Sequence, residues 1–576
     1  MNRIGAQIVW ECLLREGVEI VFGYPGGANL PIYDAMLDYP IRHVLGRHEQ
    51  SLVHMADGYA RACGKVGVAM ATSGPGATNL VTGIANAQMD SVPLVCITGQ
   101  VPSRMIGYDA FQESDVTGIT LPITKHNYLV THAADIMPAI REAFYIARSG
   151  RPGPVLVDIA KDAQQASIAN WAYDASPIRL PGYRPDLRPA PEIVRNAADM
   201  INSARRPLIL AGHGILISGA MAEVCRLAET AQVPVAMTLL GFGAVPATHP
   251  LNLGMMGMHG EAWVNTAIQE ADLLLACGIR FDDRITGQLN TYAVHARKIH
   301  IDIDPSEINK NVKVDAGLVG DLKDILGQIL PLVQAADRSE WRARIQSVRA
   351  NSAARDIQNF PDNGRLHAAH VIHDLWRLTR GGATIVTDVG QHQMWAAQYC
   401  RIDAPHTWIS SGGLGTMGFG LPAAIGAKLA APDREVWVIA GDGGFQMTQA
   451  ELATAAQEGI KINVAIINNG YLGMVRQWQQ FFYQGRYAAT PLRNPDFVKI
   501  AEAHDLSGLR VTRRSEVEDA IRQAESTPGT VVIDFRVEPE DTVYPMVPAG
   551  ADLHAMIRRP DPAGETAGEA PRCGRP

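Results

Sequence analysis

Two polar positions in the last third of the chain have residue types that could hold a metal ion and a phosphate. Gly441-Asp442-Gly443 follows the apolar run 436–440, and Asn468-Asn469 follows a second apolar run, 462–467. Such runs are typical of buried parallel strands, and open α/β sheets bind ligands at the carboxyl ends of these strands. A carboxylate and a carboxamide there suit Mg²⁺, which keeps octahedral oxygen ligation and often shares a diphosphate. The glycines let the backbone approach phosphate closely; two ordinary glycine turns are the alternative.

A carboxylate with a different role is expected in the first third of the chain. Gly46-Arg47-His48-Glu49-Gln50 follows a short strand at 41–45 and precedes an amphipathic helix. Glu49 is therefore expected at a strand end and at a helix start. By itself it is explained as an acidic residue near the positive helix N-terminus. Beside a reactive cofactor it becomes a candidate for proton chemistry.

The elements that must position these residues predict an α/β protein with three doubly wound parallel-sheet domains. We expect domains at 1–165, 191–332 and 365–557, a Pro-rich linker at 166–190, a polar connector at 333–364 and a disordered tail at 558–576. The first and third domains share an order of strand, glycine turn, helix and strand, at 69–97 and at 438–467. A helix is expected over 448–458.

The composition excludes several functional classes. A hydrophobic content of 47% with 19% charged residues is typical of a globular protein with large cores. The net charge of −8 provides no basic surface for nucleic acid or an anionic membrane. There is no apolar run long enough to span a bilayer and no signal peptide, and the seven cysteines form no CxxC pair. We expect free thiols and a cytoplasmic location.

The motif GDG followed by NN resembles that of the thiamine-diphosphate (ThDP) enzymes. The resemblance implies a pyrimidine-binding first domain, a diphosphate-binding third domain and active sites between two subunits. It also implies that Asp442, Asn469 and the main-chain oxygen of Tyr471 bind Mg²⁺. Glu49 would bond the pyrimidine ring of the cofactor and favour removal of its C2 proton, and Met417 would bend the cofactor, with plain core packing as the alternative for Met417. The other implied ThDP-binding residues are Pro25, Gln391, His392, Gly415, Gly441, Gly443, Gly444, Gly473 and Met474.

Within these enzymes the chain is similar to the catalytic subunits of acetohydroxyacid (acetolactate) synthases, from Gly5 to about Ile557. The segments that carry this likeness are 278–284, 470–479 and 544–551. Glu49 separates the chain from glyoxylate carboligase, which has an apolar residue there. The segment 278–284 resembles the FAD-containing biosynthetic enzymes and argues against the FAD-free catabolic form.

This likeness implies decarboxylation of pyruvate and joining to pyruvate or 2-oxobutyrate, on the route to valine, leucine and isoleucine. The implied catalytic residues are Gly27, Glu49, Gln112, Arg284 and Trp478. Arg284 would pair with the second substrate's carboxylate, or else form a surface ion pair with Asp282 or Asp283. Trp478 would favour the ethyl group of 2-oxobutyrate, or else pack in the core.

The same likeness implies a structural FAD in the middle domain, because the reaction transfers no net electrons. The implied FAD-contacting residues are Arg151, Gly212, Gly214, Thr238, Leu239, Met258, His259, Gly278, Arg280, Asp282, Arg284, Asp302, Ile303 and Asp321. His213 and Asp302 depart from the residues common in the family. A homodimer or homotetramer and a separate regulatory small subunit are also implied. Two rival hypotheses remain: a ThDP-dependent pyruvate oxidase with a redox-active FAD, and a ThDP-fold subunit that only binds.

Overall fold

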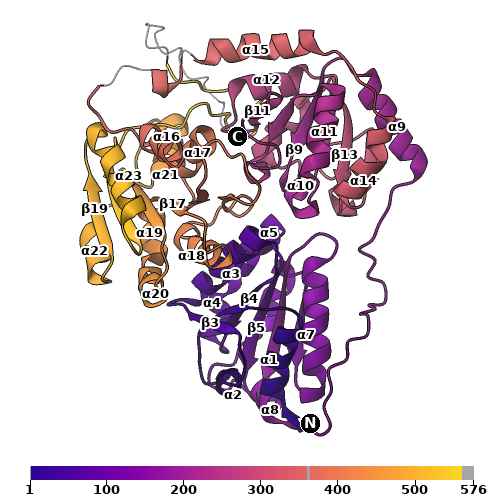
Figure 1. Ribbon diagram of the computed structural model, residues 1–576, viewed down its shortest axis with the longest axis vertical. Coiled ribbons are helices and arrows are strands. Elements are labelled where there is room, and N and C mark those ends of the chain that lie inside the picture. Colours follow the sequence, from indigo (N-terminus) through magenta and orange to yellow (C-terminus); the bar gives the residue numbers. More distant parts are fainter. Residues whose placement is uncertain (1, 354, 360–362, 561–576) are drawn as a thin grey trace.

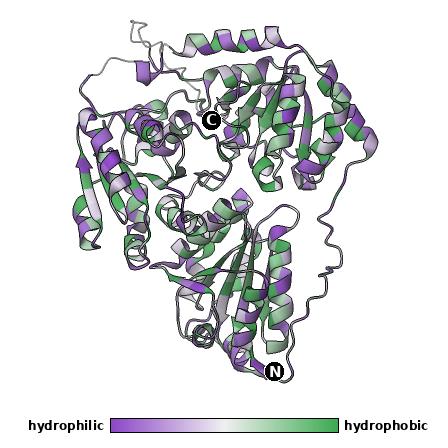
Figure 2. Cartoon of the chain, viewed as in Figure 1, coloured by the Kyte–Doolittle hydropathy of each residue, from purple (hydrophilic) through white to green (hydrophobic). Residues whose placement is uncertain are grey.

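The computed structural model describes residues 2–353, 355–359 and 363–560, which form three α/β domains around three parallel sheets (Figure 1). Each sheet has six strands, and all neighbouring strands within each sheet run parallel. The inner strands of each sheet are buried, because helices cover both faces, whereas edge strands such as β6 and β19 are partly exposed. Figure 2 shows the hydrophobic residues concentrated on these strands. The expected fold class is confirmed.

The first domain has the strand order β3-β2-β4-β5-β7-β6. Its strands are β2 (Ile20–Gly23), β3 (Arg42–Leu45), β4 (Gly67–Ala71), β5 (Leu94–Gln100), β6 (His126–Val130) and β7 (Pro154–Ala160). Its helices are α1 (Gly5–Arg15), α2 (Leu30–Met36), α3 (Glu49–Cys63), α4 (Pro75–Asn79), α5 (Val81–Asp90), α6 (Val116–Thr120), α7 (Ala133–Arg148) and α8 (Lys161–Gln165). A short antiparallel pair, β1 (Arg3–Ile4) with β8 (Ser167–Ile168), joins the two ends of the domain.

The middle domain has the order β11-β10-β9-β12-β13-β14, the order of dinucleotide-binding folds. Its strands are β9 (Pro207–Ala211), β10 (Val235–Met237), β11 (Asn252–Met255), β12 (Leu273–Cys277), β13 (Arg297–Asp302) and β14 (Ala316–Val319). Its helices are α9 (Pro191–Ser203), α10 (His213–Ser218), α11 (Met221–Ala231), α12 (Ala262–Glu270), α13 (Asp283–Thr286) and α14 (Leu322–Ile329).

The third domain has the order β16-β15-β17-β18-β20-β19, which repeats the topology of the first. Its strands are β15 (Thr384–Thr387), β16 (Trp408–Ile409), β17 (Val436–Gly441), β18 (Asn463–Asn468), β19 (Ser507–Val511) and β20 (Val531–Arg536). Its helices are α16 (Ala368–Leu378), α17 (Gln391–Tyr399), α18 (Gly420–Ala430), α19 (Asp442–Thr448), α20 (Leu452–Gln457), α21 (Gly473–Phe482), α22 (Phe497–Ala503) and α23 (Val517–Ser526). The repeat expected from the sequence is therefore a repeat of whole sheets.

The expected helix over 448–458 is wrong in its start and its continuity. Helix α19 begins at Asp442, directly after β17, and ends at Thr448, whose φ of −131° departs from helical geometry. A 3₁₀ turn, η8 (Gln449–Glu451), separates it from α20. In the first turn of α19, Gly443 and Gly444 pack so closely against Leu472 and Asp388 that neither position has room for a side chain.

Equivalent helices of the two repeats, α3 and α18, pack against each other and join the first and third domains. Their backbones touch at two glycines: a Cβ atom at Gly58 would lie 2.0 Å from the Ala423 carbonyl oxygen, and one at Gly426 would lie 1.8 Å from that of Met55. One continuous hydrophobic core runs through this contact, from Phe22 in the first sheet to Val438 in the third.

The connecting segments lie on the outside of the molecule. The chain between β8 and α9 runs along one side from the first domain to the middle domain (Figure 1). Helix α15 (Ser339–Ala353), in the connecting segment after the middle domain, packs on α12 and buries Trp341 and Ile345. Most of the expected tail, 561–576, lies outside the described residues. No helix in the described part of the chain is long and apolar enough to cross a membrane.

Candidate active site

A small cavity of about 60 Å³ lies at the carboxyl ends of β17 and β18. It brings together most of the residues predicted to hold the diphosphate and metal: Gln391, His392, Met417, Gly441, Asp442, Gly443, Gly444, Asn469, Tyr471, Gly473 and Met474. The predicted Gly415 instead lines the larger cavity described below, which Met474 also borders. The sheet topology explains this convergence, because parallel strands end at one edge.

Asp442 is buried at the base of this cavity. Burial raises the pKa of its carboxyl group to about 6, and hydrogen bonds from Asn494 and from the Gly470 amide oppose that shift. The Asn494 side chain donates to Asp442 Oδ2 (2.6 Å) and also to Asn468 Oδ1 (2.9 Å). Within the described residues Asp442 has no ion pair, and such a desolvated carboxylate is suited to a bound metal ion.

One further polar side chain, His392, and two glycines of the cavity fit a diphosphate. His392 is buried and its Nε2 atom has no hydrogen-bond partner among the described residues. Burial lowers its pKa to about 3, although a hydrogen bond with the Asp388 backbone opposes the shift, so the ring is neutral, with one donor and one acceptor nitrogen. Gly441 and Gly473 leave the cavity open, because a Cβ atom would lie 2.8 Å from the His392 ring and 2.1 Å from Gln391 Oε1. The residues present therefore fit a diphosphate with a divalent cation.

Met417 belongs to a loop, residues 410–418, that is held from two domains. Asp388 accepts hydrogen bonds from the amides of Gly418 and Gly420. On α5 of the first domain, Asn86 Oδ1 accepts from Ser411 and Thr416, and the Asp90 carboxylate accepts from the amides of Gly412 and Gly413. Met417 lines the cavity and belongs to no core cluster, so the core-packing alternative for Met417 is wrong.

The predicted residues of the first domain form a separate group at the ends of β2, β3 and β4. Asn79 donates to Glu49 Oε2 (2.9 Å), and Gly76 lies beside Glu49 Oε1. Gly74 packs against Gln112, whose φ of 60° marks a tight loop. Gly26, between the predicted Pro25 and Gly27, packs against Thr72. None of Pro25, Gly27, Glu49 and Gln112 lines any of the three described cavities, whereas Asp442 lines the small one.

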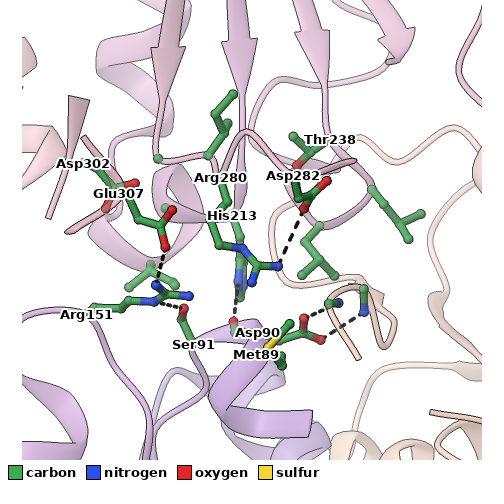
Figure 3. A pocket seen from close by; sticks show the side chains of 18 of the residues that line it. Met89, Asp90, Ser91, Arg151, His213, Thr238, Arg280, Asp282, Asp302 and Glu307 are labelled. Atoms are coloured by element: carbon green, nitrogen blue, oxygen red, sulfur yellow. Dashed lines mark hydrogen bonds and ion pairs between the residues drawn. The ribbon is translucent and has the colours of Figure 1, made fainter. Parts of the chain in front are cut away.

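A larger cavity of about 1040 Å³ opens at the carboxyl edge of the middle sheet, where the strand order reverses between β9 and β12 (Figure 3). It is lined by thirteen of the residues predicted to contact FAD: Arg151, Gly214, Thr238, Leu239, Met258, His259, Gly278, Arg280, Asp282, Arg284, Asp302, Ile303 and Asp321. The fourteenth, Gly212, lies behind them and packs on the Gly278 carbonyl.

Charged side chains of the first and middle domains meet at this cavity (Figure 3), whereas the third domain lines it with uncharged residues. Arg151 of the first domain reaches Glu307 (2.9 Å) and Asp304 (3.2 Å) of the middle domain. Burial raises the pKa of Asp302 to about 6. His213 Nδ1 lies 3.0 Å from the Asp90 carbonyl oxygen, so the residue that departs from the family pattern joins two domains. The cavity is large, is bordered by glycine turns and lies where the strand order of the sheet reverses. These three features fit a dinucleotide.

Trp478 of the third domain and Arg284 of the middle domain both line this large cavity. Trp478 is half-buried on α21, and its ring contacts that of Phe482. Arg284 lies 3.8 Å from Asp283 with both side chains exposed, so the weak surface pair is present. Its Nη1 atom also lies 3.2 Å from Met258 Sδ.

Comparison with known proteins is consistent with this geometry. Family profiles for thiamine pyrophosphate enzymes match residues 3–119 (N-terminal TPP binding domain), 194–329 (central domain) and 388–535 (C-terminal TPP binding domain). An acetolactate synthase of Mycobacterium bovis is 50% identical over 95% of this chain and 90% of its own length. The acetolactate synthase large subunit of Corynebacterium glutamicum is 48% identical over 95% of this chain and 89% of its own length. A probable acetolactate synthase large subunit of Methanocaldococcus jannaschii is 44% identical over 96% of this chain and 95% of its own length. The chain belongs to the thiamine-pyrophosphate enzymes and, within them, to the acetolactate synthase large-subunit family.

Proposed function

We propose that this protein is an acetolactate synthase that decarboxylates pyruvate and joins the remaining two-carbon unit to a second 2-oxoacid. One CO₂ leaves and one carbon–carbon bond forms to the keto carbon of pyruvate or 2-oxobutyrate. Electrons are neither gained nor lost overall. The observation that carries the proposal is the cavity in which Asp442, Asn469 and Tyr471 meet beside Met417.

The cofactor ThDP would supply the carbon nucleophile and the electron sink for decarboxylation. Asp442, Asn469 and the Tyr471 carbonyl would hold Mg²⁺, and His392 and the glycine turns would bind the diphosphate. Glu49 would hold a proton at the pyrimidine ring, the step that makes the cofactor reactive. Trp478 and Arg284 would orient the second substrate by shape and charge.

We assign FAD to the large cavity and give it a structural role, because the overall reaction is redox neutral. Arg151, Asp302 and Arg280 provide the charged contacts there. Glu49 and Asp442 share none of the described cavities of one chain. We therefore infer that a homodimer is the smallest active unit, with Glu49 of one protomer serving the cofactor held by its partner. A separate regulatory small subunit is a further proposed partner, because two of the similar proteins are named as large subunits.

The test measures pyruvate turnover by purified, cofactor-free protein. ThDP, Mg²⁺ and FAD are added back, and one of the three is left out in each assay. We expect no turnover without ThDP or Mg²⁺. Acid treatment of the product should release acetoin, which is detected by colour and indicates acetolactate. Acetyl phosphate and peroxide would instead indicate a pyruvate oxidase, and turnover that is independent of ThDP would overturn the proposal.

A further inference from the structure

Glu451 of the third domain is fully buried and holds the main chain directly before Glu49 of the first domain. Its Oε1 atom accepts hydrogen bonds from the amides of Arg47 and His48, both at 3.1 Å. Its Oε2 atom accepts a second bond from Arg47 N (3.2 Å) and one from the Thr454 hydroxyl (2.7 Å). The two amides belong to the residues that immediately precede the expected catalytic carboxylate.

The surroundings of Glu451 indicate that it fixes the backbone of the turn and does not neutralise a positive side chain. No Lys, Arg or His forms an ion pair with Glu451 in the described part of the chain; the Arg47 guanidinium turns away to Gln457 (2.8 Å) and to main-chain oxygens. Burial raises the pKa of the Glu451 carboxyl group. A buried carboxyl group that is satisfied mainly by backbone amides is costly, and here those amides define one turn of one loop.

That turn sets where Glu49 points. Helix α3 begins at Glu49, so the orientation of its first residue follows from the backbone of residues 46–48. Gly46 packs so closely against Leu52 that a Cβ atom there would clash, so the chain before Glu49 has no room for a side chain at this position. On the other side, Asn79 is the one described residue that forms a hydrogen bond with the Glu49 side chain.

We propose that Glu451 is a positioning residue that orients Glu49 for proton transfer at the cofactor. The inference rests on the proposed function, in which Glu49 acts on ThDP. In the proposed dimer this role of Glu451 links the two active sites. The third domain of each protomer binds one cofactor and, through Glu451, orients the Glu49 that serves the other.

A plain interdomain contact is the competing explanation, and the chain offers a matched control. Glu458, from the same segment of the third domain, pairs with Arg42 of the first domain at 2.8 Å. This pair also crosses the domain boundary, but it lies at the start of β3 and makes no contact with the turn before Glu49. Glu458→Gln therefore removes a carboxylate bridge between the same two domains without altering the Glu49 turn.

The experiment measures hydrogen–deuterium exchange at C2 of bound ThDP, by acid quench and NMR, in wild type, Glu451→Gln, Glu451→Ala and Glu458→Gln. A misplacement of about 1 Å costs up to ~100-fold in rate, so we expect Glu451→Ala to slow exchange by roughly 10- to 100-fold. Glu451→Gln keeps one acceptor oxygen and should slow it less. Affinity for ThDP with Mg²⁺, measured by titration, should stay within about 3-fold, since the cofactor contacts are untouched, and Glu458→Gln should exchange like wild type.

The outcomes separate the inference from the proposed function. If wild type shows no accelerated exchange, the proposed function fails. If wild type is fast and both folded Glu451 variants exchange at its rate, the positioning role is wrong while the function stands. If Glu451→Ala does not fold, Glu451→Gln decides alone. Equal slowing by Glu458→Gln would reduce Glu451 to an ordinary domain contact.

Discussion

The side-chain nitrogen of Asn494 lies 2.6 Å from Asp442 Oδ2 and 2.9 Å from Asn468 Oδ1. One amide group therefore ties together the ends of β17 and β18, the two strands that carry the expected metal ligands. Gln446 completes the arrangement, because its side chain donates both to Asn494 Oδ1 and to the Asp442 carbonyl, each at 3.0 Å. Asn494 and Gln446 thus hold the expected metal ligand Asp442 in place, and neither of them is an expected ligand itself.

Substitution of Asn494 by alanine should weaken binding of ThDP with Mg²⁺. Loss of a hydrogen bond that orients a metal ligand typically costs about 10- to 100-fold in affinity. Titration of cofactor-free protein with ThDP at fixed Mg²⁺, followed by calorimetry, measures the effect. Asn196→Ala on α9 of the middle domain is the control and should bind normally. Unchanged affinity in Asn494→Ala would mean that Asp442 is held adequately without this amide.

Two inactive variants should restore activity when they share a dimer. Glu49→Gln and Asp442→Asn are each expected to lose at least ~100-fold of turnover, because one removes the proton-holding carboxylate and the other a metal ligand. A mixed dimer, isolated with two affinity tags, has one site that combines intact Glu49 with intact Asp442 of its partner. Recovered pyruvate turnover confirms a site between protomers. A mixed dimer as inactive as its parents would place both residues in one chain's site.

The sequence predicted most of the residues that line the small cavity and none of the residues that support them. Asp442, Asn469 and Glu49 stand at strand ends, and a strand end is visible as an apolar run followed by glycine or a polar residue. Asn494 and Glu451 act across many residues of sequence and belong to no spaced pattern; Asn494 precedes a proline in a loop and Glu451 lies in a 3₁₀ turn. Only the folded chain shows what they contact.

Trp478→Leu should reduce the preference for 2-oxobutyrate over pyruvate as second substrate. One methylene in an apolar pocket contributes ~1–3 kcal/mol of discrimination, and leucine fills less of the cavity wall than the indole ring. The product ratio under direct competition of the two oxoacids is the measurement. Trp376→Leu is the control, because this tryptophan lines none of the described cavities. A product ratio that matches wild type would exclude Trp478 from acceptor selection.

Stability should depend on pH through the buried Asp158. Burial raises its pKa from 3.8 to about 6, although hydrogen bonds from Thr98 and Gln100 oppose the shift. The folded state therefore binds this proton more tightly than the unfolded state, so the stabilisation is present below the unfolded pKa and is lost as pH rises through about 6. Two pKa units correspond to about 3 kcal/mol.

The measurement is the difference in Tm between Asp158→Asn and wild type, followed from about pH 4 to about pH 8. The variant cannot ionise there, so this difference should become more positive as pH rises, whatever constant cost the substitution carries. A difference that is flat with pH, or that becomes more negative, contradicts a raised pKa at Asp158.

Two glycine substitutions should have opposite effects on stability. Gly58→Ala places a Cβ atom 2.0 Å from the Ala423 carbonyl oxygen, so α3 and α18 must separate, at a cost of about 1–3 kcal/mol or more. Gly327→Ala in α14 has no atom within 4 Å of the new Cβ, and alanine favours a helix interior by roughly 0.8–1 kcal/mol. Denaturant unfolding compares the two. A tolerated Gly58→Ala would mean that the two repeats are joined by contacts other than this close backbone approach.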